Sequence, residues 1–355
     1  MAQESLSHQR RHAIIAAWLF TVGVMVFAMV ILGGVTRLTH SGLSMVDWRP
    51  VTGWLPPLGE TQWGEAFAKY REKPEYLKMN LGMTLAEFKA IFWFEYLHRL
   101  WGRLIGVFFF VPFVFFFAKG WVNRALAVKL AALFVLGGLQ GALGWYMVKS
   151  GLIDRPDVSQ YRLTAHLGTA LVIMSYMLWV ALGLLRADPF PLQGPDEGPP
   201  VRSLWRFSLG IAILVFIAAL SGGFVAGLDA GFVYNTFPLM DGKLIPDGIF
   251  TLDPLYRNVF EDIKTVQFDH RVLVETVAVL IALFWFRART IPLATGARRA
   301  VNALALAVLV QVGLGITTLV MVVPVPVASA HQAGAVVLLM TSLWTVHALR
   351  PPPTF

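Results

Sequence analysis

Eight apolar runs of membrane-spanning length dominate this sequence of 355 residues. Each run has roughly 20 residues, the length at which an α-helix crosses the hydrocarbon core of a bilayer. Only 14% of the residues are charged, whereas a soluble domain carries about a quarter. The sequence therefore predicts an all-α polytopic membrane protein with eight transmembrane helices, at about 13–35, 92–118, 125–148, 163–185, 204–227, 267–287, 299–322 and 327–349.

The charges between these runs predict the orientation of the chain. Basic residues such as Arg10 and Arg298 gather in alternate connections, and acidic residues such as Glu60 and Asp262 gather in the others. Because short cytoplasmic segments are rich in Lys and Arg, we expect both termini in the cytoplasm. The net charge of +8 then reflects topology, and no nucleic-acid partner is predicted. The chain has no cysteine, which excludes disulfides and thiolate ligands.

The two halves of the chain repeat each other. Gly33-Gly34 closes the first run as Gly222-Gly223 closes the fifth, and each pair precedes a long loop and a run that opens with His-Arg. Gln140 in the third run corresponds to Gln311 in the seventh. Four runs per half is an even number, so both halves have the same orientation. We expect an N-terminal four-helix bundle (1–185), a cytoplasmic linker (186–203) and a C-terminal four-helix bundle (204–355).

The longest loop, residues 35–91, has the pattern of an ordered segment. Trp63, Phe67 and Tyr70 recur at helical spacing and predict a short amphipathic helix lying on the membrane face. Thr84 with Glu87 is a capping-box pattern, which predicts the start of a helix that leads into the second run. Loops of this length in compact proteins are usually functional or disordered, and the aromatic content favours a lid over the outer mouth.

Four of the eight histidines lie in the apolar runs, two per half: His98, His166, His270 and His331. The topology places them at one depth near the outer face, on the second and fourth helix of each bundle. Two facing helices that each offer one imidazole suit bis-histidine ligation of haem iron. A lone histidine in a span is often only a helix-to-helix hydrogen bonder. Zinc is less favoured, since each pair offers two ligands and few nearby carboxylates.

Charged residues accompany these histidines and distinguish the halves. Arg99 and Arg271 directly follow a histidine, and they either pair with haem propionates or extend to the membrane surface. Glu95 lies one helical turn before His98, whereas Gln267 holds the matching place before His270. A desolvated carboxylate accepts or relays protons, which a pure electron carrier does not need. The asymmetry predicts that the first half reacts and the second holds a redox cofactor.

Five motifs of the chain resemble the signatures of the haem A synthase family, in the family's order over about residues 13–349. The motifs are Gly33-Gly34-Val35-Thr36-Arg37-Leu38-Thr39, Ser41-Gly42-Leu43-Ser44, Glu95-Tyr96-Leu97-His98-Arg99, Tyr234-Asn235-Thr236-Phe237-Pro238-Leu239-Met240 and Asp269-His270-Arg271. The lack of cysteines is similar to the Cys-free branch of that family, found in proteobacteria and mitochondria.

The resemblance implies an oxidoreductase that converts haem O to haem A for aa3-type cytochrome c oxidase. A ring methyl becomes a formyl group by two hydroxylations, through an alcohol and a geminal diol. It also implies a haem b cofactor on His270 and His331, a substrate haem site at His98 and His166, and an essential glutamate at Glu95. Arg99 belongs with the substrate site and Arg271 with the cofactor site.

The resemblance also bears on partners and location. It implies haem O as substrate, an electron acceptor and membrane lipid, in a bacterial inner membrane with the haem sites near the periplasmic face. It leaves open docking with the haem O synthase (a protohaem farnesyltransferase), contact with oxidase assembly factors, and a homo-oligomer. The competing classes are a bis-histidine b-type membrane cytochrome that only transfers electrons and a transporter built from repeats. Glu95 has no counterpart in the second half, which disfavours the cytochrome. The chain also lacks charged groups at the membrane midplane, which disfavours the transporter.

Overall fold

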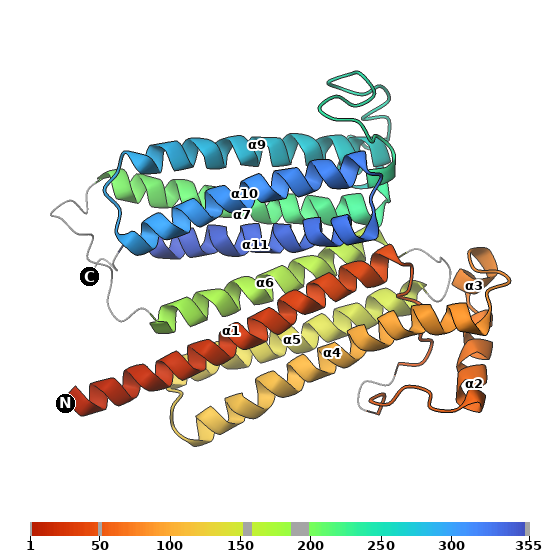
Figure 1. The fold of residues 1–355 in the computed structure, drawn as a ribbon, viewed down its shortest axis with the longest axis horizontal. Coiled ribbons are helices and arrows are strands. Elements are labelled where there is room, and N and C mark those ends of the chain that lie inside the picture. The colour runs from red at the N-terminus through yellow and green to blue at the C-terminus, as the bar shows by residue number, and fades with distance from the viewer. Residues whose placement is uncertain (1, 49–51, 152–157, 186–198, 352–355) are drawn as a thin grey trace. The chain divides into compact units, whose positions relative to one another are not determined.

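A computed structural model of the chain describes residues 2–48, 52–151, 158–185 and 199–351 (Figure 1). The described residues fold into helices and contain no strand, which confirms the predicted all-α class. The eight long helices among them are α1 (Ala2–Leu38), α4 (Leu85–Ala118), α5 (Arg124–Gly151), α6 (Gln160–Leu185), α7 (Pro199–Gly227), α9 (Ile263–Arg289), α10 (Thr295–Val320) and α11 (Val325–Leu349).

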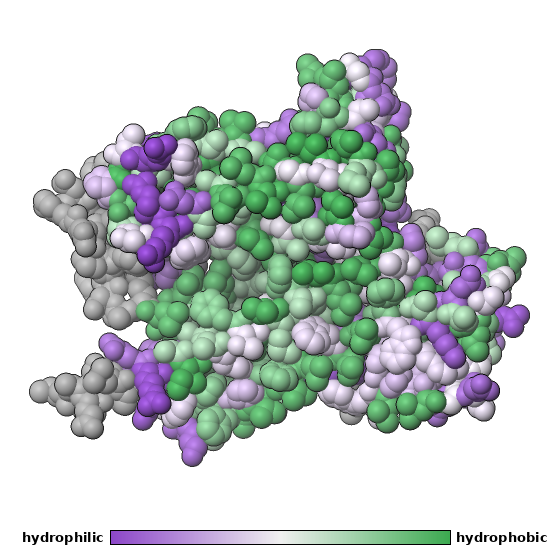
Figure 2. All heavy atoms as spheres, in the orientation of Figure 1, coloured by the Kyte–Doolittle hydropathy of each residue, from purple (hydrophilic) through white to green (hydrophobic). Residues whose placement is uncertain are grey.

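Seven of these helices are long and apolar enough to cross a membrane. The remaining one, α9, has the required length, but Asp269, Arg271 and Glu275 interrupt its apolar sequence. Large hydrophobic side chains such as Phe108 on α4 and Leu309 on α10 are exposed, and hydrophobic residues cover most of the visible helix surface in Figure 2. Such a surface suits a lipid environment.

The chain groups into two compact units, residues 24–170 and residues 1–23 together with 171–355. In the second unit, α7 packs against α9 and α11, and α10 packs against the same two helices. Most arginines of this four-helix group lie at the start of α7, the end of α9 and the start of α10, whereas Arg271 lies near the start of α9. At the shared end, Arg287 of α9 donates to the Ser203 hydroxyl of α7 at 3.0 Å. Residues 186–198 of the predicted linker lie outside the described residues. Helix α7 begins at Pro199, within the predicted range of that linker.

In the unit of residues 24–170, the long loop contains α2 (Glu60–Arg71) and α3 (Pro74–Lys78). The capping box at Thr84 is confirmed, because its hydroxyl accepts from the backbone N–H of Glu87 and its own N–H donates to the Glu87 carboxylate. The amphipathic helix is also confirmed as α2. Its position on the membrane face stays a prediction. The aromatic side of α2 is buried against α4 in a cluster of Trp63, Tyr70, Tyr76, Phe88, Phe92 and Tyr96.

The second unit has a matching outer loop between α7 and α9. It contains the short helices η1 (Ala230–Phe232), η2 (Leu255–Arg257) and α8 (Asn258–Glu261). Asp262 caps α9, because its carboxylate accepts from the backbone N–H of Thr265 at 2.7 Å. In each unit the loop therefore leads directly into the helix that carries the His-Arg pair.

Candidate functional site

The structure brings His98 of α4 and His166 of α6 together. Their imidazoles are close enough to interact electrostatically. Each ring also lies against a glycine of a neighbouring helix. A Cβ on Gly33 of α1 would be 3.2 Å from Nε2 of His98, and one on Gly144 of α5 would be 2.9 Å from Cε1 of His166. The two glycines therefore leave the space that the rings occupy.

The other unit repeats this arrangement with His270 of α9 and His331 of α11. These imidazoles also interact electrostatically. A Cβ on Gly222 of α7 would be 3.4 Å from Cε1 of His270, and one on Gly315 of α10 would be 2.9 Å from Cε1 of His331. The sequence reasoning found all four histidines but missed the role of these glycines, although their recurrence at matched places in both repeats was a signal.

In each pair, a glutamine on the adjacent helix forms a hydrogen bond to the backbone of the second histidine. Nε2 of Gln140 donates to the backbone carbonyl of His166 at 2.9 Å, and Nε2 of Gln311 donates to that of His331 at 3.0 Å. These bonds join α5 to α6 and α10 to α11 at the level of the histidines. They fix the rotation and height of the helix that presents each imidazole.

The histidine pairs fit a haem better than a bare metal ion. Nδ1 of His166 and Nδ1 of His331 are buried without a hydrogen-bond partner, and each of these rings lies directly against a glycine. No group of three or more His, Cys, Asp or Glu side chains suited to a metal ion occurs among the described residues. Two imidazoles match the two axial positions of haem iron.

The two arginines bind the loop before their helix in the same way. Arg99 donates to the backbone carbonyls of Met45 and Asp47, at 2.9 and 3.0 Å. Arg271 donates to the backbone carbonyls of Tyr234 and Thr236, at 2.7 and 2.9 Å. In both cases the carbonyls are two residues apart. Sequence reasoning missed this use of the arginines, since a bond to a backbone carbonyl leaves no mark on the residue type.

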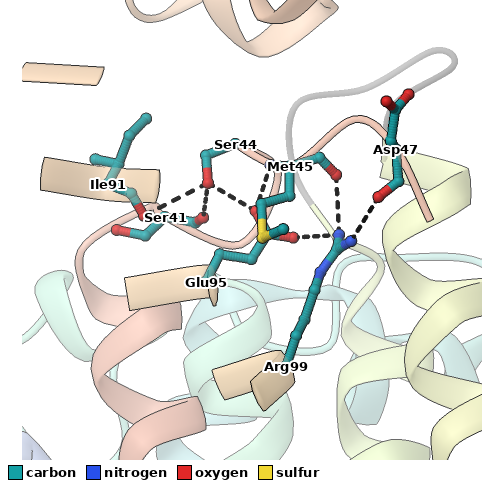
Figure 3. A network of polar contacts seen from close by, with 7 residues as sticks. All are labelled: Ser41, Ser44, Met45, Asp47, Ile91, Glu95 and Arg99. Atoms are coloured by element: carbon teal, nitrogen blue, oxygen red, sulfur yellow. Dashed lines mark hydrogen bonds and ion pairs between the residues drawn. The ribbon is translucent and has the colours of Figure 1, made fainter. Parts of the chain in front are cut away.

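Glu95 is the centre of a buried polar network, shown in Figure 3. Only 2% of the residue is exposed. One carboxylate oxygen accepts from the Ser44 hydroxyl and from the Met45 backbone N–H, both at 2.7 Å. The other oxygen pairs with the Arg99 guanidinium. Together with Arg99, this carboxylate fixes residues 44–47 of the loop over α4.

Gln267 occupies the same place in the other unit without a charge. Its side-chain oxygen accepts from the Tyr234 backbone N–H at 3.2 Å, and its side-chain nitrogen donates to the Tyr234 carbonyl at 3.0 Å. The amide therefore fixes the loop as Glu95 does. The two units share this geometry, and they differ in that only the first has a carboxylate one turn before its histidine.

Comparisons with known proteins give matches over nearly the whole chain. The family model COX15-CtaA, described as cytochrome oxidase assembly protein, matches residues 16–343. A protein of Nitrosospira multiformis named Heme A synthase is 55% identical over 336 residues, 95% of this chain and 93% of the relative. Heme A synthase of Nitrosomonas eutropha is 51% identical over 96% of this chain and 95% of the relative.

A eukaryotic relative gives the same result. Heme A synthase COX15 of Bos taurus is 47% identical over 98% of this chain and 85% of the relative. The matches cover nearly all of this chain at about half identity. The chain belongs to the COX15-CtaA family of cytochrome oxidase assembly proteins.

Proposed function

We propose that this chain is a haem A synthase, which oxidises a ring methyl of haem O to a formyl group by successive hydroxylations. The product, haem A, serves aa3-type cytochrome c oxidase. The relatives named Heme A synthase support the activity. The observation that carries it within the structure is the pair of equivalent histidine sites, of which only one has a buried carboxylate beside its histidine.

The substrate haem O binds at His98 and His166 in the N-terminal bundle (1–185), and haem b binds at His270 and His331 in the C-terminal bundle (204–355). The linker 186–203 joins the bundles. Glu95 supports this assignment, because oxidation of a methyl group releases protons and creates positive charge that a fixed carboxylate stabilises. His270 and His331 would hold haem b, which would supply one-electron redox chemistry there.

Glu95 acts as the proton acceptor and electrostatic stabiliser for the methyl group. Its carboxylate accepts three hydrogen bonds, from the Ser44 hydroxyl, the Met45 backbone N–H and the Arg99 guanidinium. When it takes a proton it must give up part of its pairing with Arg99, because a neutral carboxyl accepts less strongly. Proton uptake by Glu95 is thereby coupled to the hydrogen bonds that Arg99 donates to the backbone carbonyls of Met45 and Asp47. This loop shields the site from water.

The arginines also face the haem propionates in this proposal. Arg271 is the better placed of the two, because its Nε is buried without a hydrogen-bond partner. Within the described part of the chain it forms no ion pair, whereas Arg99 pairs with Glu95. A buried unpaired cation is costly, and a propionate would compensate it. Arg99 has less charge to offer and mainly orders the loop.

The protein lies in the bacterial inner membrane with eight spans, α9 included. Both termini face the cytoplasm, and the haem sites lie near the periplasmic face. The segregation of charge supports this orientation, since basic residues gather at one end of the helices and acidic loops at the other. Haem O would reach the protein from the membrane or from the protohaem farnesyltransferase that makes it. We also expect contacts with oxidase assembly factors and the formation of a homo-oligomer.

Co-expression with a haem O-producing enzyme tests the function. Haems extracted from the purified wild-type protein should include haem b and haem A on chromatography. Glu95→Gln should retain bound haem and form no haem A, whereas the control Glu87→Gln, in the exposed capping box of the same helix, should form haem A at the wild-type rate. Haem A formation at the wild-type rate by Glu95→Gln would contradict the role of Glu95. Haem b without haem O or haem A would instead indicate an electron-transferring cytochrome.

A further inference from the structure

The two histidines of the His-Arg pairs differ in what holds their imidazole rings. Nδ1 of His270 lies 2.9 Å from the Ser221 hydroxyl, which comes from α7. Matching Gly33-Gly34 with Gly222-Gly223 places Leu32 of α1 at the position of Ser221. Among the described residues, no side chain or backbone group forms a hydrogen bond to the ring of His98. The ring of His270 thus has a polar support from α7, and the matching sequence position in α1 holds an aliphatic residue.

The orientation of the two rings differs accordingly. For His98, the ring atom closest to the Cβ position of Gly33 is Nε2, at 3.2 Å. For His270, the ring atom closest to the Cβ position of Gly222 is Cε1, at 3.4 Å, because Nδ1 is turned toward Ser221. The His270 ring therefore has its Nδ1 edge toward Ser221 of α7, whereas the His98 ring has its Nε2 edge against Gly33 of α1.

A hydroxyl at Nδ1 has a definite effect on an iron ligand. When Nε2 of a histidine binds a metal, Nδ1 carries the proton and needs an acceptor, and that acceptor fixes the tautomer and the ring orientation. When Nε2 of His270 binds iron and Nδ1 carries the proton, the Ser221 hydroxyl is placed to accept from it. The bond also makes the imidazole a stronger electron donor, so it favours oxidised iron and slows dissociation.

We propose that Ser221 is a positioning residue that makes His270 a permanent haem ligand, and that Leu32 leaves His98 as a ligand for a haem that exchanges. This inference rests on the proposed function, in which the first site takes up a substrate and releases a product while the second retains its cofactor. Ser221 therefore belongs to the site that retains its haem, and Leu32 belongs to the site whose haem exchanges.

Removing the hydroxyl tests the first part. In Ser221→Ala, transfer of haem b from the purified protein to apomyoglobin should be faster by on the order of 10-fold or more, the usual effect of losing such a partner. The reduction potential of the haem should become more positive. Ser221→Thr, which keeps a hydroxyl, should restore both values toward wild type. A transfer rate and potential in Ser221→Ala equal to wild type would overturn the proposal.

Ser208→Ala is the matched control. Ser208 is a buried serine on the same helix, about 20 Å from Ser221 along the axis, and its hydroxyl donates to the Trp205 carbonyl. Its replacement removes a helical hydroxyl of the same kind but should change neither the transfer rate nor the potential. An equal change in Ser208→Ala and Ser221→Ala would show a general loosening of α7 and would contradict a specific role for Ser221.

Adding a hydroxyl to the first site tests the second part. Leu32→Ser should increase the fraction of haem O and haem A that stays on the purified protein and slow its transfer to apomyoglobin. Unchanged retention would refute the assignment of Leu32. His270→Ala and His331→Ala separate this inference from the proposed function: if they leave the haem b spectrum intact, the cofactor assignment itself fails, whatever the Ser221 variants do.

Discussion

Gly315→Ala offers a sharp test of the histidine sites, because the new methyl group would meet the His331 ring. The Cβ would lie 2.9 Å from Cε1 and 3.4 Å from Nδ1 of His331. Separations below 3.0 Å do not persist in real structures, so the imidazole must move. Gly313, two residues earlier on α10, has no atom within 4 Å of its Cβ position. Gly313→Ala is thus the same substitution without the collision.

The expected magnitude follows from two opposing effects. Alanine replaces glycine in a helix with a gain of about 1 kcal/mol in stability. Overpacking typically costs about 1–3 kcal/mol. In the haem-free protein the His331 ring can rotate away, so the cost is small there. With haem bound the ring is fixed by iron, and the cost appears in binding. We therefore expect haem affinity to fall by about 5- to 150-fold, while the haem-free protein stays folded.

Haem titration of the haem-free protein, followed by its absorption spectrum, measures this affinity. Thermal unfolding of the same samples measures stability. Gly315→Ala should bind haem b more weakly than wild type, and Gly313→Ala should bind it as wild type does with equal or higher stability. If Gly315→Ala binds haem b with wild-type affinity, then the imidazole of His331 does not bind iron in the orientation seen here, and the reasoning fails.

Three further variants probe the loops. Arg271→Lys should speed proteolysis of the loop between α7 and α9 in membranes by roughly tenfold or more, because lysine cannot hold the Tyr234 and Thr236 carbonyls together and each charged hydrogen bond contributes about 1.5–3 kcal/mol. Thr84→Ala should increase hydrogen exchange at the first turn of α4, since losing such a cap costs about 1 kcal/mol. Burial and the nearby Glu75 carboxylate raise the pKa of Tyr70 above its ordinary value. The unfolded chain therefore ionises first, so the contact of α2 with α4 should weaken as pH rises above about 10, and Tyr70→Phe should remove this dependence in aromatic fluorescence.

The histidine pairs could be predicted because their signal is discrete. An imidazole in an apolar run is rare, and the repeat places His98 with His270 and His166 with His331. Helix length and alternating direction then bring the members of each pair to one level. The capping box at Thr84 was predictable for a similar reason, since it depends on residues within one turn.

Other features could not be predicted, because the same residue has several favourable partners. The aromatic side of α2 could bury itself in lipid or in protein, and its packing on Phe88 and Phe92 decides between them. The partners of Arg99 are backbone carbonyls, which every residue has. The support that Ser221 gives His270 depends on a rotation of α7 that hydrophobicity alone does not specify.

The duplication separates what a haem site needs from what gives each site its task. Both units keep a glycine against each imidazole, a glutamine on a histidine carbonyl, and an arginine on two loop carbonyls. These features shape a slot and hold its loop, and they involve no difference in charge. The units differ at two matched positions. Glu95 in the first corresponds to Gln267 in the second, and Leu32 corresponds to Ser221. In the proposed function, the first difference gives the substrate site a proton acceptor, and the second leaves its histidine without a hydroxyl support. Both changes fall in the unit that we propose binds a haem, reacts with it and releases it.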